Sequence, residues 1–508
     1  MATFEKVPVV DVHCENISII WPSLLLAVRS SDFIGIDLEL SGLGNRRNLV
    51  TRCMEDRYKF ISEVAKSRSI LAVGLACFKI TGIVSDGLGL QFQAQTFNLT
   101  TLCNEEYVVE PDALQFLVNH GFDFNKQYSK GMYYSRGVDK ETKMQKHNIR
   151  ELITEMVACK KPVVFHNGLV DLVFLYENLY CPLPGSYSSF IADISEMFPG
   201  GIYDTKYIAE YKSHMNASYL EYVFRKSQRE NAVLSTSGQK HIQISFCSYP
   251  QGVGFVEYRH CELPANLQEP MEEKLNPVEF CKQYGSHGWC CRGISCPYSH
   301  DPDIILDNEH LQKHKRKRKR NRKRKRSGND VEDKHSMETD EIEETKKKGK
   351  SDECTMDVKE KDMKSTEGQN DIESMVKDRK ENESSVEIAT IPKTDETKSV
   401  RTLEKKPAPG KHRAGFDAFM TAYSLASFLG KCKHLEDSTV TKHETSLDTR
   451  FQIDVKNLLY LSGKSVPLLV EKSHFSKTSS FHREKIHKIC PPKFKHITEV
   501  ILESKGIH

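Results

Sequence analysis

Apolar residues in the first half of the chain follow the period of β-strands. They predict three successive strands at residues 32–40, 69–80 and 90–99, with the sequences DFIGIDLEL, SILAVGLACFKI and LQFQAQTFNL, which are rich in β-branched and apolar residues. Helical patterns at 110–121, about 146–159, 168–180 and 188–197 are interleaved with expected strands at 161–167 and 201–208. This order predicts an α/β domain with a central mixed β-sheet.

A long polar stretch divides the apolar pattern. No aromatic residue lies between Tyr298 and Phe416, and residues 327–406 are largely Glu, Lys, Asp, Ser and Thr. Such a stretch cannot bury enough apolar surface to offset the entropy lost on ordering, so we expect it to be disordered. Apolar patterning returns at 415–430 and 457–470. The predicted domain therefore has one part at 1–265 and a second at 408–476, with a tail of uncertain role at 477–508.

The charge balance changes the picture in one place. The chain of 508 residues has a formal net charge of +3, but twelve of the fourteen residues at 313–326 are Lys or Arg. The rest of the chain is therefore mildly acidic, which excludes a uniformly basic nucleic-acid coat. No apolar run is long enough for a membrane span, and the N-terminus lacks the features of a secretory signal. The 15 cysteines are expected to be reduced thiols.

Two carboxylates share one face of the first predicted strand. Asp37 and Glu39 are two residues apart in FIGIDLEL, while the alternate apolar residues fill the other face. Such close carboxylates repel unless a cation lies between them, and hard dications prefer oxygen ligands. Taken alone, the pair is also consistent with an exposed polar strand face.

Two further acidic motifs follow along the chain. Asp171 interrupts an apolar run at the start of a predicted helix, four residues after Asn167; helix capping would also explain it. In HRAGFDAFMTAYSLASFL, His412 and Asp417 are five residues apart, and Asp417 lies on the apolar face of a helix. Taken singly, His412 is consistent with a core histidine and Asp417 with a surface aspartate.

The three motifs in this order resemble the DEDD exonucleases of the His-bearing subtype. The similarity is closer to the poly(A)-specific ribonuclease family of deadenylases. It rests on the segments FIGIDLELSGL, LAVGLACF, VVFHNGLVD, YDTKYIAE and HRAGFDAF, and on the pair Arg57-Tyr58. The resemblance covers roughly residues 19–223 and 412–476. It implies a ribonuclease H-like exonuclease domain with a central mixed sheet, interrupted by the inserted segment between its two parts.

The resemblance also implies a set of site residues. Two Mg²⁺ ions would be held by four carboxylates, those of Asp37, Glu39, Asp171 and Asp417. His412 would take a proton from the attacking water as 5′-AMP leaves the RNA 3′ end. Three residues are candidate substrate contacts: His166, Asn167 and Lys206. For Lys206, a salt bridge at a strand edge is an equally good interpretation.

A second motif lies in the segment 270–302. Cys281, Cys290, Cys296 and His300 have the spacing C-x8-C-x5-C-x3-H, which predicts one structural zinc ion with a closed tetrahedral ligand set. Using Cys291 in place of Cys290 gives a poorer spacing. The motif resembles CCCH fingers, which bind single-stranded RNA by stacking bases on aromatic residues. Tyr284 and Tyr298 occupy suitable places, and we expect little sequence preference.

The segment 303–407 contains the basic tract and the charged insertion. The density of the tract predicts a nuclear-localisation signal that binds a nuclear import receptor, and non-specific binding of phosphates is the alternative. The residues concerned are Lys315, Arg316, Lys317, Arg318, Lys319, Arg320, Arg322, Lys323, Arg324, Lys325 and Arg326. A long insertion between two parts of one site is tolerable because loop-closure entropy grows slowly with length.

Together these motifs predict a Mg²⁺-dependent 3′-to-5′ exoribonuclease that removes adenosines from single-stranded RNA in the nucleus. Similarity to nuclear deadenylases with a CCCH finger further implies a location in nuclear bodies such as Cajal bodies and in nuclear speckles. It also implies that the 3′ tails of small nuclear RNAs are substrates. A catalytically silent RNA-binding scaffold and a DNA exonuclease are the alternatives. Related deadenylases are often dimers, so a homo-oligomer is also expected.

Overall fold

The computed structural model describes residues 3–84, 87–137, 139, 147–250, 252–264, 267, 278–327, 413–432, 447–451 and 453–490. The segment expected to be disordered lies outside these residues from 328 onward, and so does His412. Residues 1–319 and 406–508 form one compact unit, which contains the sheet and both candidate sites. No helix among the described residues combines the length and apolar character needed to cross a membrane.

Eleven described strands form one mixed sheet in the order β11-β10-β7-β6-β2-β3-β4-β1-β9, with β5 and β8 also paired to β4. β2, β3 and β4 are antiparallel neighbours, whereas β6 and β7 run parallel to β2. The mixed α/β sheet predicted from the sequence is therefore confirmed. The strands are β1 (Lys6–Val12), β2 (Phe33–Leu40), β3 (Ile70–Ile83), β4 (Gly89–Cys103), β5 (Met132–Tyr134), β6 (Val163–Phe165), β7 (Ile202–Asp204), β8 (His241–Phe246), β9 (Val256–His260), β10 (Leu458–Leu459) and β11 (Leu468–Leu469).

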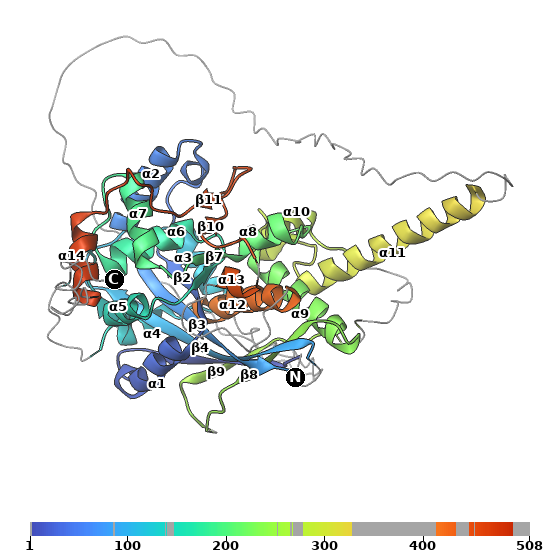
Figure 1. The fold of residues 1–508 in the computed structure, drawn as a ribbon, viewed down its shortest axis with the longest axis horizontal. Coiled ribbons are helices and arrows are strands. Elements are labelled where there is room, and N and C mark those ends of the chain that lie inside the picture. The colour runs from blue at the N-terminus through green and yellow to red at the C-terminus, as the bar shows by residue number, and fades with distance from the viewer. Residues whose placement is uncertain are drawn as a thin grey trace, which may run out of the picture. The chain divides into compact units, whose positions relative to one another are not determined.

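Helices cover the sheet and connect its strands (Figure 1). They are α1 (Ile17–Ser30), α2 (Met54–Ser67), α3 (Pro111–Asn119), α4 (Phe124–Lys130), α5 (Ile149–Cys159), α6 (Leu169–Leu175), α7 (Tyr187–Met197), α8 (Thr205–Tyr207), α9 (Leu220–Thr236), α10 (Lys282–His287), α11 (Pro302–Ser327), α12 (Ala414–Lys431), α13 (Leu447–Phe451) and α14 (Ser480–Ile489). Short turns occur at η1 (Asn48–Val50), η2 (Tyr176–Tyr180), η3 (Ile208–Lys212) and η4 (Gly293–Ser295).

Two expected elements differ from the structure. The strand predicted at 201–208 ends at Asp204, because the Asp204 side chain accepts hydrogen bonds from the backbone of Lys206 and Tyr207 and so starts α8. The helix predicted at 168–180 is α-helical only over α6 and continues as the wider turn η2. Both differences leave the order of elements unchanged.

The two faces of β2 pack against different helices. Ile34, Ile36 and Leu38 belong to the core that also contains residues of α1, α2, α5 and α6. Phe33, on the opposite face, belongs to the core that contains α12 and part of α9. In Figure 1 the orange α12 lies against the blue strands of the sheet centre. The alternation predicted for this strand is therefore confirmed, and the face that carries Asp37 and Glu39 is the face covered by α12.

The helix α12 approaches the sheet very closely. A Cβ atom added at Gly74 of β3 would lie 1.8 Å from the backbone oxygen of Ala414, and one at Gly35 of β2 would lie 2.5 Å from that of Ala418. Both contacts are far shorter than packed atoms permit, so only glycine allows this spacing at these positions. The close approach brings the first turn of α12 over the carboxylate face of β2.

The last part of the chain completes the same unit. Leu458 of β10 pairs with Tyr203 of β7, in parallel. The helix α14, which lies in the tail expected to start at 477, packs against α5, and its buried His482 shares a hydrogen bond of 3.1 Å with the Tyr180 hydroxyl. This tail therefore contributes to the fold as far as Ile489.

Candidate metal centre and finger

Three acidic side chains from distant parts of the sequence meet at one point. Asp37 and Glu39 come from β2 and Asp417 from the first turn of α12, and one oxygen of each lies within 4.8 Å of the others. Glu39 and Asp417 are buried. Carboxylate oxygens at this spacing are the ligand set that Mg²⁺ and similar hard cations prefer.

The electrostatics of the cluster support the same interpretation. The pKa of Asp37 is raised well above its usual value by burial, followed by repulsion from Asp417, Asp171 and Glu39. Burial likewise raises the pKa of Asp171 to about 7. Asp171 thus lies close enough to act on Asp37, although it is not one of the three acids with oxygens within 4.8 Å. A bound dication would relieve this repulsion and favour the ionised forms of Asp37 and Asp171.

The start of α12 is fixed by polar contacts with the sheet. Asp11 of β1 is paired with Arg413 and accepts a hydrogen bond of 2.9 Å from Lys126. Asn98 of β4 accepts a hydrogen bond of 3.2 Å from the backbone of Gly415. These contacts hold the residue directly after His412. Because His412 itself lies outside the described residues, its role as the proton acceptor stays a prediction.

Asp204 organises the loop that precedes Asp171. This buried carboxylate accepts backbone hydrogen bonds from Asn167 at 3.0 Å, from Gly168 at 3.3 Å and from Tyr460 at 3.0 Å. Asn167 has a positive φ of 66°, a conformation that Asn tolerates better than most residues. The contacts join the ends of β6 and β7 to β10, and they set the direction in which α6 starts.

The structure gives two of the three expected substrate contacts another role. The ring nitrogens of His166 bond to Thr205 Oγ1 and to the Ser218 carbonyl, both at 2.9 Å. Lys206 donates to the hydroxyl of Ser218 at 2.8 Å and lies over the Tyr460 ring. Both side chains thus support the fold around Asp204. Their contact with substrate stays a prediction, as does that of Asn167.

The four expected zinc ligands also meet. The Sγ atoms of Cys281, Cys290 and Cys296 and one ring nitrogen of His300 lie within 4.8 Å of one another, a geometry that fits one tetrahedral ion. The backbone N–H of Arg292 donates to Cys290 Sγ at 3.4 Å and is the main cause that lowers the pKa of this thiol. The exposed Cys291 is not part of this cluster, which agrees with the preferred spacing.

The segment around these four ligands, residues 278–302 and here called the finger, packs against α9 rather than standing apart from it. The Tyr284 ring stacks on His300 with centroids 4.3 Å apart, and its hydroxyl donates to Glu221 of α9 at 2.9 Å. Gly288 follows α10 with a φ of 75°, and an added Cβ there would lie 2.5 Å from the Tyr219 ring. The expectation that Tyr284 stacks on bases is wrong in this structure, because its ring and hydroxyl are engaged in the interface.

Sequence reasoning missed several residues that build these sites. Asp11 and Asp204 position the start of α12 and of α6. A signal for Asp11 existed, since it interrupts the apolar run VPVVDVH. On the finger, Trp289 is 53% exposed and Tyr298 is 44% exposed, so Trp289 takes the place of Tyr284 as an accessible aromatic side chain.

An α/β sheet with an acidic centre over one strand fits a site for a divalent metal ion, and the comparisons give the family. The model of the CAF1 family ribonucleases matches residues 12–148 and 138–425. Because this is more than half of the chain, the chain belongs to the CAF1 family of ribonucleases.

Individual relatives are more distant. The pre-piRNA 3′-exonuclease trimmer of Bombyx mori is 42% identical over 74 residues, which cover 15% of this chain and 13% of the relative. The poly(A)-specific ribonuclease PARN of Xenopus laevis is 26% identical over 121 residues, covering 22% and 19%. The chain therefore matches less than a fifth of the length of either relative. Among solved structures, S. pombe Pop2p in its Mg²⁺- and Mn²⁺-bound form is 18% identical, with a TM-score of 0.34 and coverage of 44% of this chain and 82% of Pop2p.

Proposed function

We propose that the chain is a Mg²⁺-dependent 3′-to-5′ exoribonuclease of the ribonuclease H-like type that removes adenosines from RNA and releases 5′-AMP. The observation that carries the proposal is the meeting of Asp37, Glu39 and Asp417 within 4.8 Å, with Asp171 close enough to raise the pKa of Asp37. Membership of the CAF1 family supports hydrolysis of RNA. The names of the matched relatives support a 3′ exonuclease with preference for poly(A).

Different residues of the site would bind metal, accept a proton and position the loop. The carboxylates of Asp37, Glu39, Asp171 and Asp417 fit two Mg²⁺ ions, which when bound supply charge stabilisation at the reacting phosphate and activation of water. Asp11 pairs with Arg413, the residue that follows His412 in the sequence. An imidazole such as that of His412 is suited to accept the proton of the attacking water near neutral pH. Asp204 keeps the loop before α6 in place, and α6 carries Asp171, which acts on Asp37.

The finger and the tract suit an enzyme that handles RNA in the nucleus. A zinc ion bound by the four-ligand cluster would hold Trp289 and Tyr298 on an exposed surface, where bases can stack. The basic tract would bind a nuclear import receptor. This combination is similar to that of the nuclear deadenylase called target of early growth response protein, so we propose a protein of that class, with action in nuclear bodies and on small nuclear RNA 3′ tails.

The catalytic proposal is tested on a gel. A 5′-labelled RNA ending in adenosines is incubated with the protein and Mg²⁺ or EDTA, beside Asp37→Ala and the same sequence as DNA. The expected result is a Mg²⁺-dependent ladder that shortens from the 3′ end of RNA and is absent in the variant. Hydrolysis of DNA alone would identify a DNA exonuclease. Zinc-dependent RNA binding without a ladder would identify a scaffold.

The nuclear proposal needs a separate test in cells. Deleting residues 313–326 is expected to leave hydrolysis of a short RNA largely intact, because the acidic centre lies on other elements. Nuclear accumulation of a fluorescent fusion should fall. An unchanged distribution between nucleus and cytoplasm would refute the import role of the tract.

A further inference from the structure

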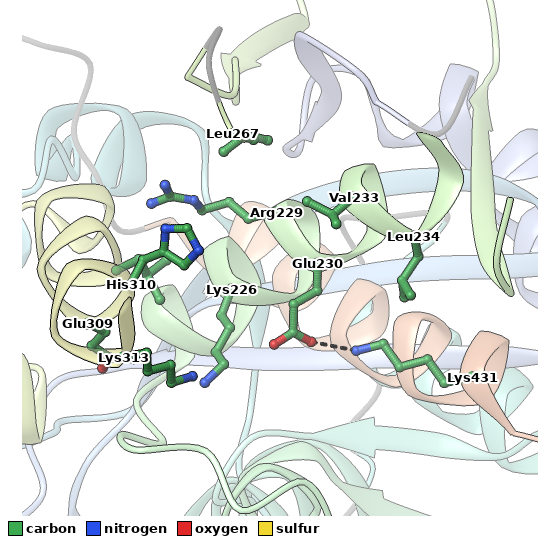
Figure 2. Close-up of a pocket in the computed structure, with 11 residues that line it drawn as sticks. Lys226, Arg229, Glu230, Val233, Leu234, Leu267, Glu309, His310, Lys313 and Lys431 are labelled. Atoms are coloured by element: carbon green, nitrogen blue, oxygen red, sulfur yellow. Dashed lines mark hydrogen bonds and ion pairs between the residues drawn. The ribbon is translucent and has the colours of Figure 1, made fainter. Parts of the chain in front are cut away.

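A pocket of about 460 Å³ lies where α9, α11 and α12 meet, away from the acidic centre (Figure 2). We call it the α9–α11 pocket. One part of its wall is apolar and is formed by Val233, Leu234, Leu267 and Leu306. The remainder is charged, with cations in excess: Lys226, Arg229, Lys313 and Lys431 against Glu230 and Glu309, together with His310. A pocket with an apolar wall and excess positive charge suits an anion that carries a flat apolar group.

Several of these charges are already engaged within the protein. Lys431 donates to Glu230 at 2.7 Å, and Arg229 pairs with Asp307 and with Asp303. Glu309 accepts a hydrogen bond of 2.9 Å from the Tyr222 hydroxyl. The contacts of Arg229 and Glu309 attach α11 to α9, and that of Lys431 attaches α12 to α9, so most of the pocket wall is formed by packed helices.

Two ammonium groups remain. Lys226 contacts the hydroxyl of Tyr222 at 3.3 Å, and neither it nor Lys313 pairs with a carboxylate in the part of the chain that is described. In Figure 2 the ammonium ends of Lys226 and Lys313 point toward one another. The pKa of Lys226 is lowered mainly by burial, whereas Glu230 and Glu309 act to raise it. The smaller effects of Lys313 and Lys431 lower it, which shows that other cations lie near its ammonium group. Like charges held together in this way are stabilised by an anion between them.

We infer that the α9–α11 pocket binds single-stranded RNA upstream of its 3′ end, with a phosphate between Lys226 and Lys313 and a base or sugar on the apolar wall. The inference rests on the proposed function. Lys431 lies fourteen residues after Asp417 on α12, or about 21 Å along the helix axis. This distance is too long for the nucleotide being removed, so the pocket would bind an earlier part of the strand.

The position of the pocket relative to the finger supports RNA as the occupant. The helix α11 starts at Pro302, directly after the ligand His300. Leu306 of α11 and Tyr284 of the finger belong to the same small apolar cluster. A strand that contacts the finger can therefore continue along the pocket. The exposed Lys315 and Arg316 follow Lys313 on the same helix and add positive charge beyond it.

The test compares RNA of two lengths. Lys226→Met and Lys313→Met are combined, because methionine keeps an unbranched apolar stem and removes the charge. Binding is measured by fluorescence anisotropy without Mg²⁺ and without chelator, so that RNA is not cut and zinc is kept. For a longer single-stranded RNA, Kd should rise about tenfold. The slope of the logarithm of the binding constant against the logarithm of salt concentration should become shallower by about 0.7 for each lost phosphate contact. For a trinucleotide ending in adenosine, Kd and the rate of hydrolysis with Mg²⁺ should not change.

The controls separate the pocket from catalysis and from folding. Lys59→Met changes an exposed lysine of α2 and should not affect binding, whereas Lys226→Arg with Lys313→Arg should restore it. An unchanged Kd for the longer RNA, or an equal loss for both lengths, would overturn the inference. Failure of the wild type to hydrolyse the trinucleotide would instead count against the proposed function, because the binding measurement does not depend on hydrolysis.

Discussion

At the scale of single residues, the acidic centre places carboxylates so close together that their mutual repulsion destabilises the fold without a cation. Burial and three neighbouring acids raise the pKa of Asp37, and burial raises that of Asp171 to about 7. An ionised carboxylate is normally more stable in water than beside other buried carboxylates. A fold that keeps such a cluster gains stability only when a cation is bound, so binding of metal and stability should be linked.

The variant Asp37→Asn tests this link. Without metal, the variant should unfold at a higher temperature than the wild type. Its free energy of unfolding should be larger by about 1 kcal/mol or more, since each pKa unit of mutual repulsion corresponds to about 1.4 kcal/mol. Mg²⁺ should stabilise the wild type by about 2.7 kcal/mol at a hundred times its Kd. The variant should show little of this stabilisation, and hydrolysis should fall by orders of magnitude.

The measurement is thermal unfolding with and without Mg²⁺ in metal-free buffer. Asp56→Asn is a matched control, because Asp56 is an exposed acid on α2, and this variant should behave as the wild type does. An equal stabilisation by Mg²⁺ in wild type and Asp37→Asn would mean that the ion is bound elsewhere.

At the scale of elements, the site depends on how α12 lies on the sheet. The two faces of β2 and the inward position of Asp417 followed from the periods of apolar residues, and the structure agrees with both. The close approach at Gly74 could not be predicted, because it depends on a non-local contact with Ala414 that leaves no periodic signal. The same holds for Asp204 and Lys206, which both contact Tyr460, far along the sequence.

Asp11 fixes the start of α12, and this gives a prediction with a defined pH dependence. Burial opposes ionisation of Asp11, but Arg413 and Lys126 outweigh it and lower its pKa. Because the folded pKa is lowered, the pair stabilises the fold above the unfolded pKa of about 3.9, and this stabilisation is lost as the pH falls through the lower folded value. At neutral pH, Asp11→Asn should destabilise the protein by about 2 kcal/mol, since it leaves Lys126 without its anion and Arg413 with only that of Glu257.

Urea denaturation at a series of pH values measures this effect. The difference in free energy of unfolding between wild type and Asp11→Asn should be largest at neutral pH and should shrink as the pH falls below about 4. Glu15→Gln is the control, because Glu15 is an exposed acid paired with Lys130, and such pairs contribute little. A difference that persists undiminished in acid would show that the charge of Asp11 is not the cause.

At the scale of the whole molecule, the finger and the nuclease part of the unit share an interface. Sequence spacing alone treated the finger as a separate inserted module, yet its ligand His300 stacks on Tyr284, and Tyr284 donates to Glu221 of α9. The helix α9 packs in turn against α12, which carries Asp417. Zinc bound at this cluster would therefore stabilise the exposed Trp289 and Tyr298 in a fixed position relative to the acidic centre, instead of on a free tether.

The pair Cys296→Ser and Cys291→Ser tests this role of zinc, because only the first residue belongs to the ligand cluster. Cys296→Ser should lose the bound zinc, and its backbone amides in α10 and near Glu221 should exchange hydrogen faster, since the support of Tyr284 is lost. Cys291→Ser should keep both the zinc and the protection. Hydrolysis of a trinucleotide should survive in each variant, because the acidic centre lies on β2 and α12. Zinc retained by Cys296→Ser, or slow exchange around Glu221 after zinc is lost, would mean that the finger docks on α9 without its metal.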